Sequence, residues 1–266
     1  MIIAITAMTG TTTWKGIHPL LTLLLMIVAA YTIIPAVLTR IFGWSVLKKG
    51  RKDQGIAWTF DDGPDSSYTT HLLDVLKKYR VKATFFILGA KAEKHPDLIL
   101  RMHKEGHLIG IHNYVHRSNW FMTPWSTWRQ IKHSAEIVER ITGVKPIHYR
   151  PPWGLINIFD FILLHKRFHI VLWSVMVGDW SRKVSREKIK QRLLKKISNG
   201  AIITLHDCGE TFGADEGAPR HMIGALEDVL KETANRGYTW ARIDEMTSNN
   251  PTYHPFKNQR KHPFIH

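Results

Sequence analysis

The sequence predicts an α/β fold, with a parallel sheet rolled into a closed or nearly closed barrel and preceded by one N-terminal transmembrane helix. Two patterns predict it. From about Asp53, short apolar runs typical of buried strands alternate with longer amphipathic runs typical of helices, and this alternation requires a parallel sheet. Before that point the chain has a long stretch without charged residues. Seven strand units in roughly 190 residues fit one barrel better than two domains.

The composition is that of a globular protein with basic ends. Of 266 residues, 44 % are apolar and 22 % are charged, which excludes a disordered, collagen-like or coiled-coil chain. The single cysteine, Cys208, excludes an internal disulfide framework. The net charge of +15 is concentrated toward the ends, because residues 1–52 and 247–266 contain basic but no acidic residues. Without a recognisable nucleic-acid module, we expect no nucleic-acid partner.

The first expected element is a membrane anchor within residues 1–52. Between Lys15 and Arg40 there is no Asp, Glu, Lys or Arg, and most of the stretch is apolar. A helix over about residues 18–38 nearly matches a hydrocarbon core of roughly 30 Å, and Pro35 near its end could kink it, which membrane helices tolerate. A cleaved signal peptide is the alternative. It is disfavoured by the weak positive charge before the stretch and the lack of a small-residue cleavage site after it.

The charges around the span bear on its orientation. Five basic residues follow it between Arg40 and Lys52, whereas only Lys15 precedes it. The positive-inside bias therefore favours a cytoplasmic C-terminal domain. A long domain can cross the membrane despite such charges, so the extracytoplasmic side stays open.

Residues 53–246 carry the alternating pattern and form one expected domain, followed by a disordered basic tail over 247–266. Seven runs are expected as strands: Gly55–Phe60, Ala83–Leu88, His107–His112, Ile147–Arg150, His169–Trp173, Ala201–His206 and Tyr238–Ile243. Glycine is the natural residue after a helix end. Four of the helical stretches end at one: Gly106, Gly143, Gly200 and Gly237.

Polar residues follow the predicted strands at one end. They are Asp61 and Asp62 after the first strand, His112 at the end of the third, Arg150 of the fourth, Asp179 after the fifth, and His206 at the end of the sixth. Active sites of parallel barrels lie at the C-terminal ends of the strands. We therefore expect these side chains, which are remote in sequence, to meet on one face.

Two of these positions suggest a metal site. His112 and His116 are four residues apart, so both imidazoles can reach one point, and a carboxylate from another strand would complete a site with two histidines and one oxygen ligand. Alone, the pattern is weak, because histidines at this spacing are more often surface residues. The segment Asp61-Asp62-Gly63-Pro64 is likewise often only a turn, here before a helix capped by Asp65.

Five ordered motifs together resemble those of the polysaccharide deacetylases, the NodB-homology or carbohydrate esterase 4 family. The motifs are Thr59-Phe60-Asp61-Asp62-Gly63-Pro64, His112-Asn113-Tyr114-Val115-His116, Arg150-Pro151-Pro152-Trp153, Asp179-Trp180 and Leu205-His206-Asp207. The resemblance runs from about Trp58 to Ile243 and leaves out the apolar stretch and the tail. It implies a distorted (β/α)7 barrel of the NodB-homology type. It also implies a hydrolase that removes N-acyl groups, most often N-acetyl groups, from amino sugars.

The resemblance also implies roles for individual residues. Asp62, His112 and His116 would hold a divalent metal, most often zinc, with cobalt, nickel, manganese or iron as alternatives. Asp61 would be the general base toward a metal-activated water, and His206 the acid that protonates the departing amine. Arg150 would orient Asp61, and Asp179 would contact His206. The substrate would be bound by Pro151, Trp153, Trp180 and Leu205.

Three positions depart from the family pattern. Asn113 replaces a usual Ser or Thr and can still form hydrogen bonds locally. Met176 replaces an aspartate, so a polar contact near the site is lost. Thr204 replaces a leucine of the acyl pocket, which leaves the identity of the acyl group open. The groups for metal binding and proton transfer are all retained, so we expect an active enzyme.

The substrate has two candidates, an amino-sugar polymer or oligosaccharide and a lipid-linked sugar at the membrane surface. Apolar Leu155 to Leu164, and the aromatic residues from Trp120 to Trp128, could line a glycan groove or lie at a membrane interface. The basic stretch Arg182 to Lys196 is either a solvated face or a patch for anionic lipid. The family that the sequence resembles usually acts outside the cell, which slightly favours an extracytoplasmic domain. We expect a monomer. Less favoured alternatives are a non-catalytic, membrane-tethered polymer-binding protein and a phosphoesterase.

Overall fold

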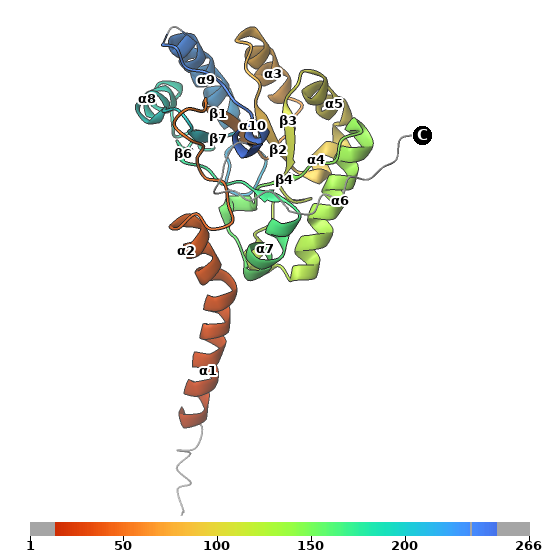
Figure 1. Ribbon diagram of the computed structural model, residues 1–266, viewed down its shortest axis with the longest axis vertical. Coiled ribbons are helices and arrows are strands. Elements are labelled where there is room, and N and C mark those ends of the chain that lie inside the picture. The colour runs from red at the N-terminus through yellow and green to blue at the C-terminus, as the bar shows by residue number, and fades with distance from the viewer. Residues whose placement is uncertain (1–13, 235, 249–266) are drawn as a thin grey trace, which may run out of the picture.

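The chain forms one sheet of seven parallel strands in the order β5-β4-β3-β2-β1-β7-β6 in this computed structural model (Figure 1), which describes residues 14–234 and 236–248. Its strands are β1 Ala57–Asp61, β2 Thr84–Ile87, β3 Leu108–Ile111, β4 His148–Tyr149, β5 His169–Ile170, β6 Val175–Met176 and β7 Ile202–His206. All six neighbouring pairs are parallel. The predicted parallel α/β fold is therefore confirmed.

The sheet is a curled half-barrel, open between its edge strands β5 and β6. Within the described residues, no ladder of hydrogen bonds joins these two strands. The segment at Leu47 covers the β5 edge instead, since its backbone N–H donates to Ile170 at 2.9 Å and its carbonyl accepts from Leu172 at 2.8 Å. The barrel is thus incomplete on the side where the N-terminal segment enters the domain.

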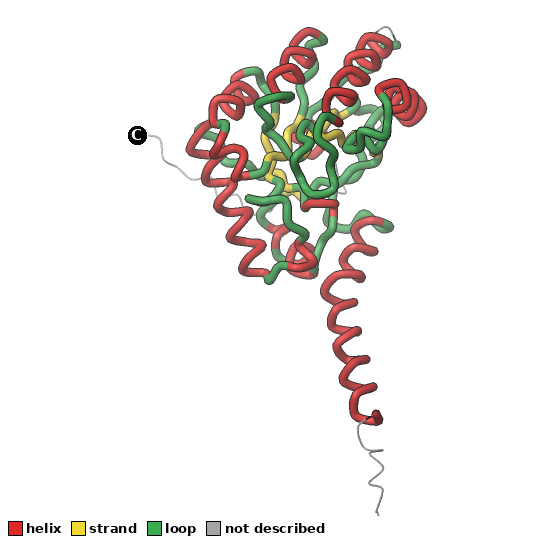
Figure 2. The backbone as a smooth tube through the Cα atoms, turned by 180° about the vertical axis from the view of Figure 1, so that it is seen from behind, coloured by secondary structure: helices red, strands yellow, loops and turns green. Residues whose placement is uncertain are grey.

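Helices surround the sheet and extend from it on one side. The helical elements are α1 Trp14–Val28, the π-helical η1 Ala29–Ile33, α2 Ile34–Arg40, α3 Thr69–Lys78, α4 Gly89–Lys94, α5 Pro96–Lys104, η2 Asn119–Phe121, α6 Pro124–Thr142, η3 Pro152–Gly154, α7 Ile158–Ile162, η4 Leu164–Lys166, α8 Arg186–Lys196, α9 Ala218–Ala234 and α10 Ile243–Ser248. Helices α8, α9, α3, α5 and α6 follow one another around the sheet. Helices α2 and α7 lie on the side from which α1 extends (Figures 1 and 2).

Strand alternation divides the interior into two hydrophobic clusters. Trp58 and Phe60 of β1 lie in the larger cluster with apolar residues of the surrounding helices, whereas Ala57 lies in a smaller one with Ile202 and Met246. Successive side chains of a strand point to opposite faces. Asp61 therefore shares the inner face with Ala57, at the C-terminal end of the strand.

The N-terminal helix is continuous from α1 through η1 to α2. Residues His18–Arg40 form 23 residues that are long and apolar enough to cross a membrane, and few of them are buried against the domain. The π-helical turn precedes Pro35, which cannot donate the helical hydrogen bond. The predicted apolar helix is present, extending two residues beyond the expected end of the span.

Two strand predictions need correction. Tyr238–Ile243 is not a strand: Trp240 makes only an isolated bridge to Ile56, and α10 begins at Ile243. Asp244 and Glu245 favour this helix start because carboxylates are stabilised near a helix N-terminus. The seventh strand is instead β6. Its two residues are too few to show the apolar pattern by which a strand is predicted. Helix α10 extends to Ser248, beyond the expected domain end at 246, and residues 249–266 lie outside the described residues.

The basic stretch forms α8, whose apolar side packs on the domain. Ile189 and Leu193 are buried. Two of the cations pair with acidic residues of α9: Arg186 with Asp228 at 2.6 Å and Lys190 with Glu232 at 3.5 Å. These ion pairs favour the interpretation of α8 as a solvated, partly paired face.

Candidate metal and active site

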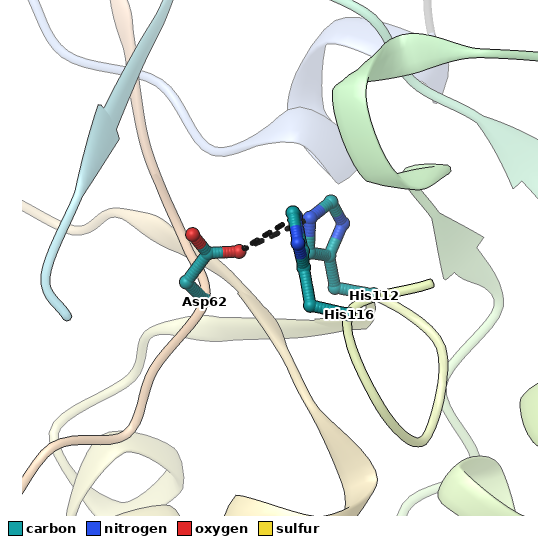
Figure 3. A group of neighbouring side chains, drawn as sticks. All are labelled: Asp62, His112 and His116. Carbon is teal, nitrogen blue, oxygen red and sulfur yellow. Dashed lines mark ion pairs between the residues drawn. The ribbon is translucent and has the colours of Figure 1, made fainter. Parts of the chain in front are cut away.

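Three potential metal ligands meet at the C-terminal ends of the strands. Asp62 follows β1, and His112 and His116 lie in the loop after β3. The Oδ1 atom of Asp62 is 3.3 Å from Nε2 of His112 and 3.3 Å from Nε2 of His116 (Figure 3). The expected gathering of these side chains is therefore present.

Asp62 is held with one oxygen directed at the imidazoles. Its backbone has a left-handed φ of 75°, which aspartate tolerates better than most residues. Thr211 Oγ1 donates to Oδ2 at 2.7 Å, whereas the buried Oδ1 accepts no hydrogen bond. Burial opposes the charge, but the neighbouring His112, His116 and His206 hold the pKa of Asp62 well below its usual range. Thr211 belongs to none of the five motifs, so it could not be found from sequence.

Both imidazoles direct Nε2 toward Asp62. His112 Nδ1 lies 2.7 Å from the carbonyl oxygen of Arg150, and because a carbonyl only accepts, Nδ1 carries a proton and Nε2 is the nitrogen directed at Asp62. Burial lowers the pKa of His116 to about 4, so this ring is neutral at pH 7. The edge of His116 packs on Trp153, with ring centroids 4.2 Å apart.

This group fits a divalent metal. A buried carboxylate oxygen without a hydrogen-bond donor, facing two imidazole nitrogens, is a donor set that suits zinc and leaves coordination positions open. A second group in the described residues, Asp65, Cys208 and Glu210, is less suitable. The ammonium of Lys91 donates to Cys208 Sγ, and burial raises the pKa of Cys208 to about 12, so the thiol is protonated at pH 7.

Asp61 is fixed beside this group by a buried guanidinium. Arg150 is fully buried, and its Nη1 donates to Asp61 Oδ1 and to Thr59 Oγ1, each at 2.7 Å. The same guanidinium donates to two backbone carbonyls after β5, at 3.2 and 3.1 Å, and its centre lies 4.1 Å from the ring centroid of Phe86. These contacts hold Asp61 in one orientation.

His206 is paired with Asp179. Asp179 Oδ2 accepts the backbone N–H of His206 at 2.7 Å and lies 3.2 Å from its Nδ1. Burial disfavours the imidazolium, but Asp179, and beyond it Asp62 and Asp61, outweigh this effect and raise the pKa of His206 to about 9. His206 is therefore charged at pH 7, with Nε2 as the nitrogen not directed at Asp179.

Aromatic side chains lie around the group. Trp153 is 38 % exposed and has a left-handed φ of 54°, a strained conformation for a bulky residue. Trp180 packs edge-on near His206, with centroids 5.5 Å apart. The exposed Phe212 lies edge-on to Trp153 at 6.4 Å. Pro151 is buried, contrary to its expected contact with the substrate.

Leu205 is not at the site, contrary to its expected role in substrate binding. It is fully buried in the larger hydrophobic cluster. Strand alternation explains this, because His206 faces the site and its neighbour in β7 must point to the opposite face. Thr204 faces inward but is 1 % exposed, with Oγ1 3.4 Å from that of Thr59.

The N-terminal helix reaches the site through Arg40. Its Nη2 donates to the carbonyl oxygen of Trp153 at 2.5 Å, and the guanidinium lies 5.0 Å from the ring centroid of Trp173. From the sequence, Arg40 is only one of the basic residues that flank the apolar span. The contact joins the end of the apolar N-terminal helix to the loop that carries Trp153.

Asn113 fixes the loop between the two histidines. It is fully buried with a left-handed φ of 66°, which Asn adopts more readily than Ser or Thr. Its Oδ1 accepts from Tyr149 at 2.8 Å, and its Nδ2 donates to Asn119 Oδ1 at 2.9 Å and to the carbonyl of Arg117 at 3.0 Å. The departure from the family pattern is thus accommodated by backbone conformation.

Replacing Asn113 by alanine should destabilise the fold more than replacing it by glycine. Both variants lose the buried hydrogen bonds, each loss costing about 1–3 kcal/mol, but only alanine adds the left-handed penalty of about 1–2 kcal/mol. Denaturant unfolding of the two variants measures the difference. An alanine variant at least as stable as the glycine variant would contradict this account of the loop.

The curled parallel half-barrel is the architecture of NodB-type carbohydrate esterases. The family model described as "Polysaccharide deacetylase" matches residues 48–158. The chain is 36 % identical over 193 residues to a peptidoglycan-N-acetylglucosamine deacetylase of Bacillus cereus, covering 72 % of this chain and 67 % of the relative. The chain therefore belongs to the polysaccharide deacetylase family.

Two further comparisons place the domain within this family. The crystal structure of the Bc1960 peptidoglycan N-acetylglucosamine deacetylase has a TM-score of 0.71 and 31 % identity, covering 80 % of this chain and 97 % of that one. The peptidoglycan-N-acetylmuramic acid deacetylase PdaC of Bacillus subtilis is 32 % identical over 191 residues, which are 72 % of this chain but 38 % of PdaC. The likeness to PdaC thus concerns one part of a longer protein.

Proposed function

We propose that the protein is a metal-dependent hydrolase that removes N-acyl groups, chiefly N-acetyl groups, from amino-sugar polymers or oligosaccharides. One observation supports this above all: a fixed carboxylate, Asp61, and a charged imidazole, His206, adjoin the Asp62, His112 and His116 group. Amide hydrolysis needs a base for the water and an acid for the amine. The names of the relatives, which are peptidoglycan deacetylases, agree with this chemistry.

Asp62, His112 and His116 would hold the metal, for which zinc is our first choice. A bound divalent ion would lower the pKa of water and polarise the amide carbonyl. Asp61, held through Oδ1 by Arg150, takes the proton of the attacking water at Oδ2. His206 donates the proton at Nε2 to the departing nitrogen, while Asp179 holds the ring. A backbone N–H near Trp153 supports the developing oxyanion.

The aromatic rim suits a sugar substrate. Trp153, Trp180 and Phe212 offer apolar faces around the site, and such faces pack well on the apolar sides of sugar rings. Pro151 is buried and precedes the turn that carries Trp153, so we assign it the support of this turn. We assign substrate binding to Trp153 and Trp180.

Replacing Asp179 by asparagine should shift the alkaline limit of activity to lower pH. The wild-type acid works while His206 is protonated, that is, below its raised pKa of about 9. Removing the neighbouring negative charge lowers that pKa, so kcat/KM should fall at a pH lower by about one unit or more. The pH profile of both proteins measures this, and an unchanged alkaline limb would contradict the role of Asp179.

A lipid-linked sugar is the second candidate substrate, favoured by the contact of Arg40, at the end of the anchor helix, with the Trp153 loop. Acetate release should be measured from N-acetylated glycan polymers, soluble oligosaccharides and lipid-linked amino sugars, each with and without a chelator. Chelator-sensitive release from polymer or oligosaccharide supports the main proposal. Release from the lipid-linked sugars alone favours the second. No release from any of them would refute both.

We propose that the chain is a single-pass membrane protein with an extracytoplasmic catalytic domain and acts as a monomer. The apolar helix His18–Arg40 supports the anchor. Protease access to a C-terminal tag in intact cells tests on which side of the membrane the catalytic domain lies. Degradation of the tag supports the extracytoplasmic location, and protection would place the domain in the cytoplasm.

A further inference from the structure

The exposed large apolar side chains of the described residues are not scattered. All but Val144 lie on the apolar helix, in the loop that follows it, around the candidate site, or on one further face of the domain. That face is formed by Phe121, Trp125, Ile162 and Leu163, which are 79 %, 67 %, 47 % and 49 % exposed. We call these four residues the apolar face. No step of the proposed reaction uses it.

The apolar face borders a hollow of about 500 Å³ between α6 and the segment from α7 to η4. Apolar side chains make most of its wall: Trp125, Trp128, Phe159, Leu163 and Leu164. Two cations, Lys166 and Arg167, also line it, and the guanidinium of Arg167 lies 4.7 Å from the ring centroid of Trp128. No acidic residue lines the hollow. An apolar wall with cations beside it matches a ligand that has a hydrocarbon chain and an anionic head.

The apolar face adjoins the anchor helix. Tyr31 donates from its hydroxyl to the carbonyl oxygen of Met122 at 2.7 Å, next to the N-terminal end of α6. Thr32, Pro35 and Thr39 of the helix are buried, and η1 and α2 both contact α7. Figures 1 and 2 show α7 and one end of α6 on the side of the domain from which α1 extends.

This contact sets the depth of the apolar face relative to a bilayer. Tyr31 lies nine residues before Arg40, which is about 13 Å along a helix. The 23 residues of the span measure about 35 Å and exceed a hydrocarbon core of roughly 30 Å by only a few ångströms. If the whole span is embedded, Met122 and the neighbouring apolar face lie at the level of the lipid headgroups or below.

We propose that the apolar face is inserted in the bilayer interface beside the anchor and that its hollow binds an anionic phospholipid of that bilayer. The acyl chain packs on the tryptophans and leucines, and the phosphate pairs with Lys166 and Arg167. Tryptophan is favoured at this level, and basic residues are attracted to an anionic lipid surface. The inference rests on the proposed anchor and on no step of the proposed reaction.

Site-directed spin labelling of the full chain in phosphatidylcholine–phosphatidylglycerol vesicles tests the depth. Labels are placed by Trp125→Cys and Leu163→Cys, with Leu24→Cys in the apolar helix as the bilayer reference and Lys195→Cys on α8 as the aqueous reference. The unsubstituted chain reports any labelling of Cys208, which is 1 % exposed. Labels at positions 125 and 163 should be relaxed by oxygen and shielded from a water-soluble nickel chelate, like the label at position 24. The label at position 195 should instead be accessible to the nickel chelate.

Dibrominated lipids test the choice of lipid, since bromine quenches nearby tryptophan. The fluorescence of Trp125 and Trp128 is the difference between the wild type and the double variant Trp125→Phe/Trp128→Phe. Dibrominated phosphatidylglycerol should quench this fluorescence more strongly than dibrominated phosphatidylcholine does. The double variant Lys166→Gln/Arg167→Gln should weaken the preference for phosphatidylglycerol about tenfold. Lys188→Gln/Lys195→Gln removes two charges from α8 as a matched control and should leave the preference unchanged.

Each other outcome overturns the proposal. Nickel access at 125 and 163 equal to that at 195 would place the apolar face in water. Shielding from both relaxants would mean that protein covers it, as in an association of two copies. An equal preference for phosphatidylglycerol in Lys166→Gln/Arg167→Gln and Lys188→Gln/Lys195→Gln would show that Lys166 and Arg167 do not bind the headgroup. None of these readouts involves turnover, so failure of the deacetylase proposal would leave them interpretable.

Discussion

The Asp61→Asn variant is expected to keep its metal and lose most of its turnover. Asparagine preserves the size of the side chain but cannot accept the proton of the attacking water. General-base catalysis typically contributes about 10²–10⁴-fold, so kcat should fall by about that factor. Asp61 belongs to no ligand group, because it pairs with Arg150 rather than with the imidazoles. Metal content per chain and acetate release from an N-acetylated glycan measure the two effects.

The exposed Asp74, which pairs with Arg101 on the surface, supplies a matched control for this charge change. Asp74→Asn should retain both metal and turnover. If Asp61→Asn loses the metal to the same extent as a ligand variant, Asp61 is itself a ligand and its assignment as base is wrong. Full turnover in Asp61→Asn would also contradict the assignment of Asp61 as the general base.

His116→Ala is expected to lose the metal and, with it, all measurable activity. It removes one of the two imidazole nitrogens that face Asp62 Oδ1. Replacing residues that merely support ligands typically costs about 10–100-fold in metal affinity, so loss of a ligand should exceed that range. Titration with cobalt(II), followed by its visible absorption, measures affinity without turnover.

His133→Ala is the control for His116→Ala. His133 is an exposed imidazole on α6 that packs on Tyr114, in the histidine loop, with centroids 4.9 Å apart. This variant should bind cobalt like the wild type. Similar cobalt affinity in His116→Ala and His133→Ala would exclude His116 from the ligand group.

Much of the site could be predicted because it obeys strand geometry. Asp62, His112, Arg150 and His206 follow strands that pair in parallel, so their positions at one edge of the sheet follow from the order of apolar runs and polar ends. The same geometry explains the failure at Leu205. Motif resemblance placed it with His206, but neighbours in a strand face opposite sides of the sheet.

Other features depend on loops and tertiary contacts that no periodicity encodes. Thr211 contacts Asp62 across 149 positions of sequence, and Arg40 contacts Trp153 across 113. Threonine and arginine are common residues, so the sequence does not indicate which residue Thr211 or Arg40 contacts. The strand β6 has two residues and carries no alternation, whereas the segment near Trp240 has the apolar content of a strand but forms one isolated bridge.

Anomalous diffraction at the zinc edge, from crystals of the zinc-loaded chain, would show directly which side chains hold the metal. We expect one strong peak bounded by Asp62, His112 and His116, with Asp61 and His206 beside it but not ligating. A main peak at Asp65, Cys208 and Glu210, or a zinc ion bound by Asp61 in place of either imidazole, would contradict it.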